Sequence, residues 1–318
     1  MGDTEASTLR VLVILGPTAT GKSELGVRLA QEINGEVVNA DALQVYRGLN
    51  IGTAKPPSEL RHAVPHHLLD ICEPTEVFSA GEFVRRARPV IEEIHGRGGT
   101  AILVGGSGFY LRALLDGLGP VPTTDPEVRE EVARRTAEEG LAAIYRELRE
   151  RDPETAQRLE PGDRQRIQRA LEVVLATGVP LSEWIRRKRV EPTGLAAFKI
   201  GLTVERAILY DRISGRVQRM VERGWVEEVE GLLNRGYEPD APAFQAIGYR
   251  QIVQYVLGNC RLEVALDDTI RATRRYAKRQ LTWFRKEKDV HWIPALGKAH
   301  PISSLIDEFR MHEGAVAR

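Results

Sequence analysis

Residues 11–23 read VLVILGPTATGKS, and this stretch decides the fold. Its first five residues are aliphatic, a pattern typical of a strand that is buried on both faces of a parallel sheet. Gly16 and Gly21 break the run, and residues 23–33 are predicted to form a helix. The last eight residues match GxxxxGK[ST] between that strand and that helix, as the motif requires. The stretch therefore predicts an α/β fold with a phosphate-binding loop.

The loop of residues 16–23 has the chemistry to hold an anion. Glycines let successive backbone N–H groups converge on a phosphate, and the start of the next helix adds its positive dipole end. Lys22 supplies a charge, and Ser23 can offer its hydroxyl to Mg²⁺. A glycine-rich turn without a ligand is the simpler alternative. We predict diphosphate or triphosphate binding by Gly16, Pro17, Thr18, Ala19, Thr20, Gly21, Lys22 and Ser23.

Working outward, the rest of the chain alternates strands and helices and then changes character. Further strands are predicted at residues 36–40, 100–104, 198–204 and 291–293, with a helix at 80–95. Residues 120–192 have almost no β-branched runs, and they contain charged helical segments near 125–139, 141–151 and 163–177. We therefore divide the chain into a tail, a core, a helical insertion and a core completion, at residues 1–9, 10–119, 120–192 and 193–318.

The composition is that of an ordinary folded protein. The chain has 318 residues, 42% of them hydrophobic, with 45 Lys+Arg against 45 Asp+Glu, which argues against disorder. Cys72 and Cys260 form no CxxC pair, so no zinc module or thiol-redox motif is visible. No run approaches 18 apolar residues, and the acidic start lacks an apolar secretion core. We expect a cytoplasmic protein without a membrane partner.

Asp41 follows the predicted second strand, at the sheet edge where open α/β sheets bind ligands. A carboxylate there could bind Mg²⁺ or act as a general base. A helix N-cap fits the position equally well, because residues 42–44 could begin a turn. The strand at 100–104 runs into Gly105 and Gly106 instead of a Walker-B Asp. That absence, and the lack of a guanine-reading Asn-Lys-x-Asp motif, count against an ATPase or GTPase.

An ordered set of motifs resembles the tRNA dimethylallyltransferase family, also called tRNA isopentenyltransferases. The P-loop alone is generic, whereas the set is specific and spans residues 11–293 in family order. It comprises residues 16–23, DALQVYRG at 41–48, IGTAKP at 51–56, PHHLLD at 65–70, GGSGFY at 105–110, DRQRI at 163–167, GYRQ at 248–251 and AKRQLTWFR at 277–285. The resemblance implies a P-loop NTPase (kinase-like) parallel-sheet core with a helical insertion that binds the tRNA anticodon stem-loop.

The resemblance also implies an activity and residue roles. Members move the dimethylallyl group of dimethylallyl diphosphate onto N6 of adenine 37, just 3′ of the anticodon of tRNA, and release diphosphate. It follows that the loop holds the leaving diphosphate and not ATP, with Mg²⁺ as cofactor and Ser23 as its ligand. Asp41 is then the general base, and Thr18 bonds the diphosphate end of the donor. An Arg of the helix at 210–220 also lies there, Arg216 being our first choice and Arg212 our second.

The same resemblance implies which residues contact tRNA. They are Asp41, Ala42, Leu43, Gln44, Ser107, Arg129, Gln165, Arg166, Ile167, Gln168 and Arg169. The chain departs from the family pattern at three of its motif positions. Ala42 stands where Ser is usual and lacks its hydroxyl, whereas Thr20 and Ser107 replace Ser and Thr and keep theirs.

Local basic clusters could hold RNA although the formal net charge is zero. Residues 271–288 carry eight cations against Glu287, and a stripe on the same helix would pack on the core: Ile270, Ala277, Leu281 and Phe284. Two more clusters are Arg164, Arg166 and Arg169, and residues 186–189. Each run alone is most simply a solvated helix face. Three of them beside a phosphate-binding core favour RNA.

Aromatic and histidine side chains allow more than one interpretation. Tyr110, Tyr249, Trp283 and Phe284 could stack on bases, but each alone is more simply a core residue. His66 and His67 lack further Cys or His at ligand spacing, so we interpret them as structural or substrate-orienting.

Three alternatives to tRNA prenyl transfer stay open. An adenylate isopentenyltransferase would need no helical insertion, so residues 120–192 argue against it. A P-loop kinase of a small metabolite would require ATP turnover. An RNA-binding scaffold with a dead nucleotide fold would not need the intact Lys22, Ser23 and Asp41. For the enzyme we expect a monomer.

Overall fold

The computed structural model describes residues 8–187, 194–295 and 302–316, and within the last range it places no side chains beyond residue 311. Most of the predicted tail at 1–9 therefore lies outside the described residues, and Leu9 already begins the first strand. Lys188 and Arg189 of the third basic cluster also lie outside them. No helix among the described residues is long and apolar enough to cross a membrane.

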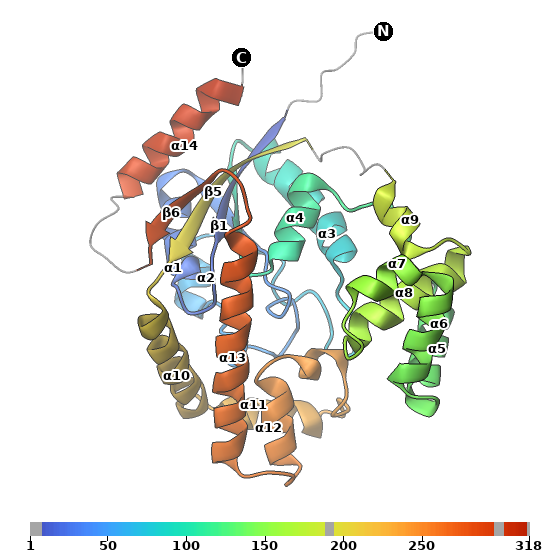
Figure 1. Ribbon diagram of the computed structural model, residues 1–318. Helices are drawn as coiled ribbons and strands as arrows, with labels where there is room; N and C mark the ends of the chain where they lie inside the picture. The colour runs from blue at the N-terminus through green and yellow to red at the C-terminus, as the bar shows by residue number, and fades with distance from the viewer. Residues whose placement is uncertain (1–7, 188–193, 296–301, 317–318) are drawn as a thin grey trace. The chain divides into compact units, whose positions relative to one another are not determined.

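A six-stranded parallel sheet forms the core, in the order β3-β2-β4-β1-β5-β6. The strands are β1 (Leu9–Leu15), β2 (Gly35–Asn39), β3 (His66–His67), β4 (Thr100–Val104), β5 (Leu195–Thr203) and β6 (Val290–Pro294). β1 lies between β4 and β5, with Val13 opposite Leu103 and Lys199. Figure 1 shows β1, β5 and β6 side by side in that order. The predicted strands are confirmed to within a few residues at their ends, and β3 was not predicted.

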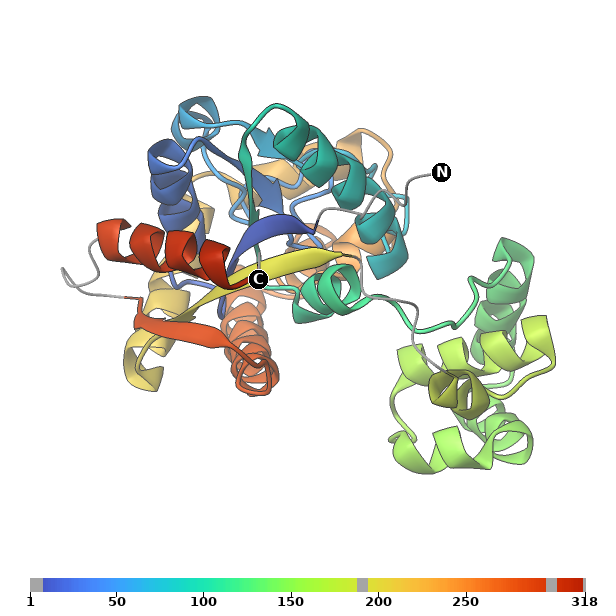
Figure 2. The same cartoon turned by 90° about the horizontal axis from the view of Figure 1, so that it is seen from above.

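Helices cover both faces of this sheet. α1 (Lys22–Glu32) and α14 (Ile302–Val316) lie next to each other (Figure 2) and share one apolar cluster with Leu12 and Ile14 of β1. Side chains alternate along a strand, so Val11 and Val13 face the opposite side, where α3 (Ala80–Gly96) packs on the sheet. α2 (Ser58–Ala63) and α4 (Gly108–Asp116) complete this part. Because both faces are covered, β1 is buried almost throughout.

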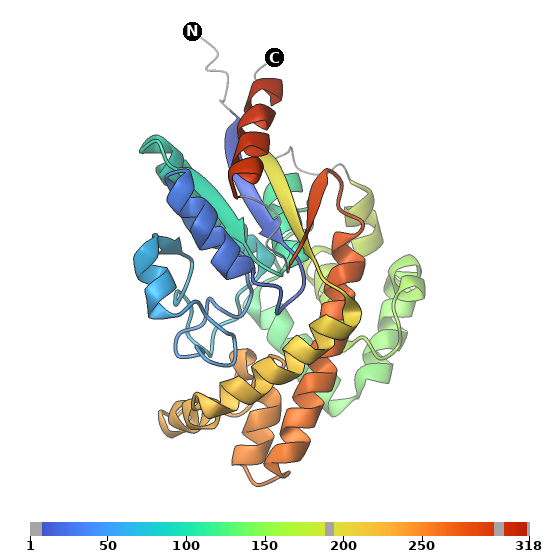
Figure 3. The ribbon, with the colours of Figure 1, turned by 90° about the vertical axis from the view of Figure 1, so that its left-hand side faces the viewer.

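The C-terminal part is mostly helical. It contains α10 (Arg206–Glu222), α11 (Trp225–Asn234), the 3-10 helix η1 (Pro242–Gln245), α12 (Tyr249–Val256) and α13 (Leu262–Phe284). α13 packs along α10 and α12 (Figure 3). The predicted stripe on α13 is confirmed, because Ala277 and Phe284 are buried while Ile270 and Leu281 are half-buried. This packing places α13 beside the end of β1, where the phosphate loop begins.

Residues 116–192 form a compact unit of their own. Its helices are α5 (Pro126–Glu138), α6 (Leu141–Arg151), α7 (Pro153–Arg158), α8 (Arg164–Thr177) and α9 (Leu181–Arg186), green to yellow-green in Figure 2. They surround a separate apolar core that includes Val132, Ile144, Leu148, Ile167 and Leu171. The rest of the chain is the second compact unit, and it contains the whole sheet.

Candidate active site

The phosphate loop connects the C-terminal end of β1 to α1 through a backbone that needs glycine. Gly16 has φ 147° and its missing side chain leaves room for the Leu202 carbonyl, 2.9 Å from where a Cβ would lie. Gly21, at φ 85°, begins α1. The Thr20 hydroxyl and the Lys22 ammonium both donate to the Pro17 carbonyl at 2.8 Å. The loop is therefore closed by its own side chains.

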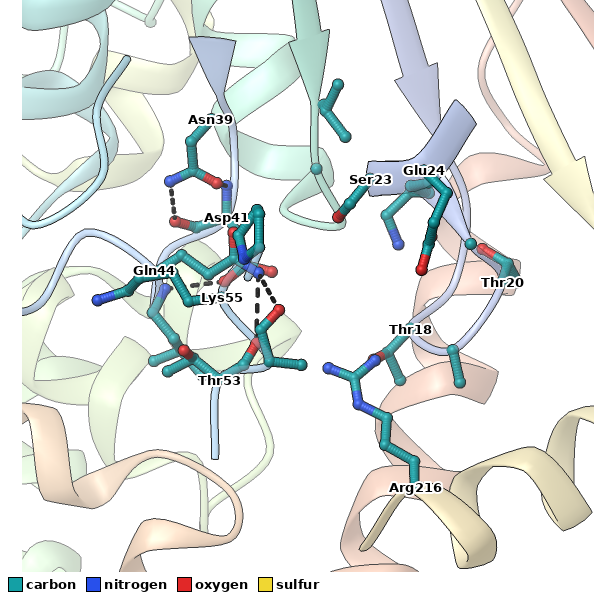
Figure 4. A pocket seen from close by; sticks show the side chains of 18 of the residues that line it. Thr18, Thr20, Ser23, Glu24, Asn39, Asp41, Gln44, Thr53, Lys55 and Arg216 are labelled. Carbon is teal, nitrogen blue, oxygen red and sulfur yellow. Dashed lines mark hydrogen bonds between the residues drawn. The ribbon is translucent and has the colours of Figure 1, made fainter. Parts of the chain in front are cut away.

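A cavity of about 1050 Å³ opens at this loop, and all the residues that line it belong to the unit that holds the sheet. Of the predicted loop residues, 18–23 line it, whereas Gly16 and Pro17 are not among its described lining residues. Figure 4 shows Thr18, Ser23 and Arg216 on one side and Asp41 and Gln44 on the other. Side chains from three stretches of the chain thus face one another across one space.

Two arginines of α10 reach the loop. Arg216 donates to the Thr18 hydroxyl at 3.2 Å, and Arg212 donates to the Ala19 carbonyl at 3.3 Å. Burial lowers the pKa of Lys22 to about 8, with the Asp41 carboxylate opposing that shift and the Arg216 guanidinium adding to it. Burial also lowers the pKa of Arg216, again opposed by Asp41. Two desolvated cations thus lie near the carboxylates of Asp41 and Glu24, and a bound anion would offset the cost of burying their charge.

Asp41 lies just beyond β2 and is held by Asn39. The buried Asn39 side chain accepts from the Asp41 N–H at 3.1 Å and donates to the Leu68 carbonyl at 3.1 Å. Asp41 Oδ1 accepts from the Leu43 N–H at 2.9 Å. No helix begins here, so the N-cap alternative is wrong: the carboxylate closes a turn instead. Among the described residues no hydrogen bond reaches Oδ2.

The residues after Asp41 are fixed from within the same unit. Ala42 N–H donates to the Ser107 hydroxyl at 3.0 Å. Gln44 donates to the carbonyls of Thr53 and Ala54, at 3.3 and 3.2 Å. The buried Lys55 ammonium bonds the Tyr46 carbonyl and, at 2.6 Å, the Asp70 carboxylate. These contacts explain the motifs at 51–56 and 65–70, which brace the loop that carries Asp41.

Three residues at this site were missed by sequence reasoning. Gln280 of α13, only 5% exposed, accepts from Thr18 N–H at 2.9 Å and donates to the Gly106 carbonyl at 2.8 Å. Glu228 accepts from the backbone N–H groups of Asn50 and Ile51. Tyr276 lines the cavity, and burial and the Asp41 carboxylate raise the pKa of its hydroxyl. Of the three, only Gln280 could have been noticed in the sequence, because it is a polar residue beside the apolar stripe predicted on α13.

The predicted tRNA-contacting residues of the insertion differ in their exposure within that unit. Arg129, Gln165 and Arg166 are exposed there. Ile167 lies in the unit's core and is completely buried. Gln168 and Arg169 turn inward: Gln168 bonds the Thr136 hydroxyl at 2.8 Å, and Arg169 bonds the Pro122 carbonyl and the Thr124 hydroxyl, each at 2.8 Å.

The basic run on α13 is mostly exposed, with one exception. Arg274 donates to the Ser214 hydroxyl at 2.9 Å and lies over the Tyr210 ring, so it joins α13 to α10. The exposed members are Arg271, Arg275, Lys278, Arg279, Arg285, Lys286 and Lys288. Of these, Arg271 is paired with Asp268, and Arg279 lines the cavity.

The aromatic and histidine positions mostly have structural partners. Tyr110, Tyr249 and Phe284 are buried, which confirms them as core residues, whereas Trp283 is half-buried under the Arg112 guanidinium. His67 pairs with Glu36 at 2.6 Å. His66 bonds the Val64 carbonyl through Nδ1 and lines the cavity.

The parallel sheet, the phosphate loop and the carboxylate facing it define a P-loop α/β transferase. A family model described as IPP transferase matches residues 44–287. A tRNA dimethylallyltransferase of Geobacter sulfurreducens is 50% identical over 97% of this chain and 99% of its own. The chain belongs to the tRNA dimethylallyltransferase family, which confirms the resemblance drawn from the motifs.

Solved structures agree with this assignment. The tRNA isopentenylpyrophosphate transferase of Bacillus halodurans is 39% identical and superposes with a TM-score of 0.68 over 96% of each chain. A eukaryotic dimethylallyltransferase solved acting on tRNA reaches 0.77 at 28% identity, over 97% of this chain and 80% of its own. The predicted fold class, a P-loop kinase-like core, is therefore confirmed.

Proposed function

We propose that this protein transfers the dimethylallyl group of dimethylallyl diphosphate to N6 of adenine 37 in tRNA. The observation that carries the proposal is the placement of Arg216 opposite Asp41 in a cavity that Lys22 also lines. The two cations suit a departing diphosphate, and the carboxylate suits an incoming amine that must lose a proton.

The reaction breaks the allylic C–O bond of the donor and forms a C–N bond to adenine. The bonding electrons leave with the diphosphate, whose charge the loop amides, Lys22 and Arg216 stabilise. Thr18 bonds the same end of the donor. Asp41 accepts the proton that N6 loses. The target base must first leave its stack to enter the cavity.

Mg²⁺ is the cofactor that we propose. Magnesium is typically held by one or two protein oxygens, with phosphate oxygens and water completing its shell. Ser23 offers such an oxygen at the start of α1, on the wall of the cavity. The described residues contain no group of three His, Cys, Asp or Glu that could hold a metal, so the remaining ligands would be diphosphate and water. When bound, the ion would neutralise charge on the leaving group.

The proposal assigns tRNA contacts to residues of both units, which are exposed in the insertion and half-buried around Asp41. In the insertion these are Arg129, Gln165 and Arg166, which would recognise the anticodon stem-loop. In the other unit they are residues 41–44, Ser107 and the exposed cations of α13. Ile167, Gln168 and Arg169 would act indirectly, by holding in place the surface of the insertion that carries the exposed contacts. We also propose that the protein acts as a monomer in the cytoplasm.

One experiment separates this function from its competitors. The protein with Mg²⁺ is incubated with labelled dimethylallyl diphosphate and either undermodified tRNA or AMP, and with ATP alone in parallel. We expect label in tRNA, at adenine 37 after nuclease digestion. Label in AMP alone would favour an adenylate isopentenyltransferase, and ATP turnover alone would favour a kinase.

A further inference from the structure

Gln280 joins the loop that cradles the donor to the loop beside the base. Its carbonyl oxygen accepts from the Thr18 N–H, and its amide nitrogen donates to the Gly106 carbonyl. The side chain is almost completely buried, so water does not compete for either bond. Each bond closes a long separation in the chain, 262 and 174 residues.

Glycines at 105 and 106 make this arrangement possible. A Cβ on Gly106 would overlap the Gln280 amide nitrogen, and a Cβ on Gly105 would overlap the Ala40 carbonyl. Neither glycine has a positive φ, so the requirement is for space and not for backbone freedom. These are the two residues that stand where a Walker-B carboxylate is found in other P-loop proteins, and here Gly106 makes room for Gln280 instead.

From Gln280 the contacts continue in both directions to reacting groups. On the donor side, Thr18 accepts a hydrogen bond from Arg216 through its hydroxyl. On the acceptor side, Ser107 follows Gly106 and receives the Ala42 N–H, directly after Asp41. Tyr276, one turn before Gln280 on α13, lies within hydrogen-bonding reach of Gln280 and Ser107. Gln280 therefore lies at the middle of a continuous polar connection from Arg216 to Asp41.

We propose that Gln280 is a positioning residue that fixes the diphosphate cradle relative to the Asp41 base. The inference rests on the proposed function and deepens it. Prenyl transfer requires the allylic carbon, the leaving oxygen and the N6 amine to be aligned, and a misplacement of about 1 Å can cost about 10²-fold in rate. Gln280 itself touches neither substrate. It acts through Thr18 and through the turn of residues 105–107.

The test compares Gln280→Met, which keeps the length of the side chain and removes both hydrogen bonds, with Thr282→Ala on the same helix. Thr282 is exposed, and its hydroxyl bonds only within its own helix, to the Lys278 carbonyl. We expect Gln280→Met to lower kcat by about 10²-fold, with little change in the KM for dimethylallyl diphosphate or in tRNA affinity. The melting temperature should fall by only a few degrees, because two groups lose a hydrogen-bond partner. Thr282→Ala should match the wild-type protein in all four measurements.

A second variant disturbs the contact between Gln280 and Gly106 by changing the glycine. Gly106→Ala fills the space of the Gln280 amide without straining the backbone, and it should reproduce the loss of kcat. Both changes break the same connection. The fold-loss of kcat in the double variant should therefore be smaller than the product of the two single fold-losses. Gly106→Ala also decides the question if Gln280→Met does not fold.

The outcomes distinguish this inference from the proposed function. If the wild-type protein transfers no label to tRNA, the proposed function fails. If it does, and both variants keep the wild-type kcat, Gln280 has no positioning role. A loss of kcat that comes only with a loss of melting temperature and tRNA affinity would show a merely structural role and would also overturn the inference.

Discussion

The two carboxylate oxygens of Asp41 have different roles: one accepts a structural hydrogen bond, and the other is available to act as the base. Oδ1 closes the turn to Leu43, and Asn39 holds the Asp41 backbone from a buried position. The orientation of the carboxylate is therefore set before any substrate arrives, so no reorganisation is needed during the reaction. Oδ2, which receives no hydrogen bond from the described residues, is the oxygen available to take a proton.

Replacing Asp41 by Asn should remove the base and keep the turn, because the amide oxygen can still accept from Leu43. We expect transfer to fall by about 10²–10⁴-fold, while tRNA affinity in a filter-binding assay stays near that of the wild type. Asp211→Asn, an exposed position on α10, is the matched control. Normal turnover by the Asp41 variant would exclude this carboxylate as the base.

The lowered pKa of Lys22 predicts how donor binding depends on pH. Lys22 must be protonated to hold diphosphate, so affinity for dimethylallyl diphosphate should weaken as the pH rises through about 8. Because the Asp41 carboxylate raises the pKa of Lys22, Asp41→Asn should move this transition to lower pH. Calorimetric titrations with the donor across this pH range measure both effects. A transition in the variant at the same or a higher pH would contradict the coupling.

At the scale of elements, the insertion depends on one buried carboxylate. Asp152, 1% exposed, accepts from the Thr155 N–H at the start of α7 and from the Ser182 N–H in α9, at 3.0 and 2.9 Å. Burial alone would raise the pKa of Asp152, but these hydrogen bonds lower it overall. The residue therefore ties two short helices together in its charged form.

We predict that Asp152→Asn destabilises the protein by about 1–2 kcal/mol at pH 7, because one buried N–H then loses its acceptor. A carboxylate whose pKa is lower in the folded than in the unfolded state stabilises the folded protein at pH values above its unfolded pKa. This contribution is lost as the pH falls below about 4. Urea unfolding of both proteins at several pH values measures the difference, which should shrink in acid. Asp125→Asn is the control, since Asp125 precedes α5 without capping it by its side chain. Equal effects of the two changes would contradict the prediction.

Local patterns predicted the elements well and long-range contacts poorly. Buried aliphatic runs identified β1, β2 and β4, and shorter apolar stretches indicated β5 and β6. β3 has only two residues, both His, and no such pattern. The loop chemistry pointed to residues 18–23, the position after the second strand pointed to Asp41, and the family resemblance pointed to Arg216. All of these line one cavity. Gln280 and Glu228 were missed because their partners are 262 and 178 residues away. The spacing of residues along the chain indicates which side chains share one face of a helix or strand. It does not indicate which helices or strands, far apart in the sequence, pack against each other.

At the scale of the whole molecule, RNA binding depends more on where the charges lie on the surface than on the net charge. The formal net charge is zero, yet α13 exposes several cations, and many arginines elsewhere are engaged with acidic neighbours, as Arg85 is with Glu82. Unpaired surface cations can approach phosphates without first breaking an ion pair. Binding of RNA by a neutral protein therefore depends on which cations are left without partners.

Lys278→Ala should weaken tRNA binding and reduce the slope of log affinity against log salt by about 1, as expected for one lost phosphate contact. The KM for dimethylallyl diphosphate should not change, because Lys278 is exposed and does not line the cavity. Arg85→Ala, which removes an already paired cation, is the control. An unchanged salt slope for Lys278→Ala would place the RNA elsewhere on the surface.

The order of the sheet has a consequence for synthesis on the ribosome. β1 emerges first, yet one of its two neighbours, β5, follows only after the insertion, at Leu195–Thr203. Until then β1 has an open edge, while residues 116–192 already possess their own core. We expect the insertion to fold on the nascent chain ahead of the domain that it interrupts, and a protease should cut stalled chains within residues 9–115 while sparing it. Since Gln280 emerges later still, a functional cradle would be among the last features to form.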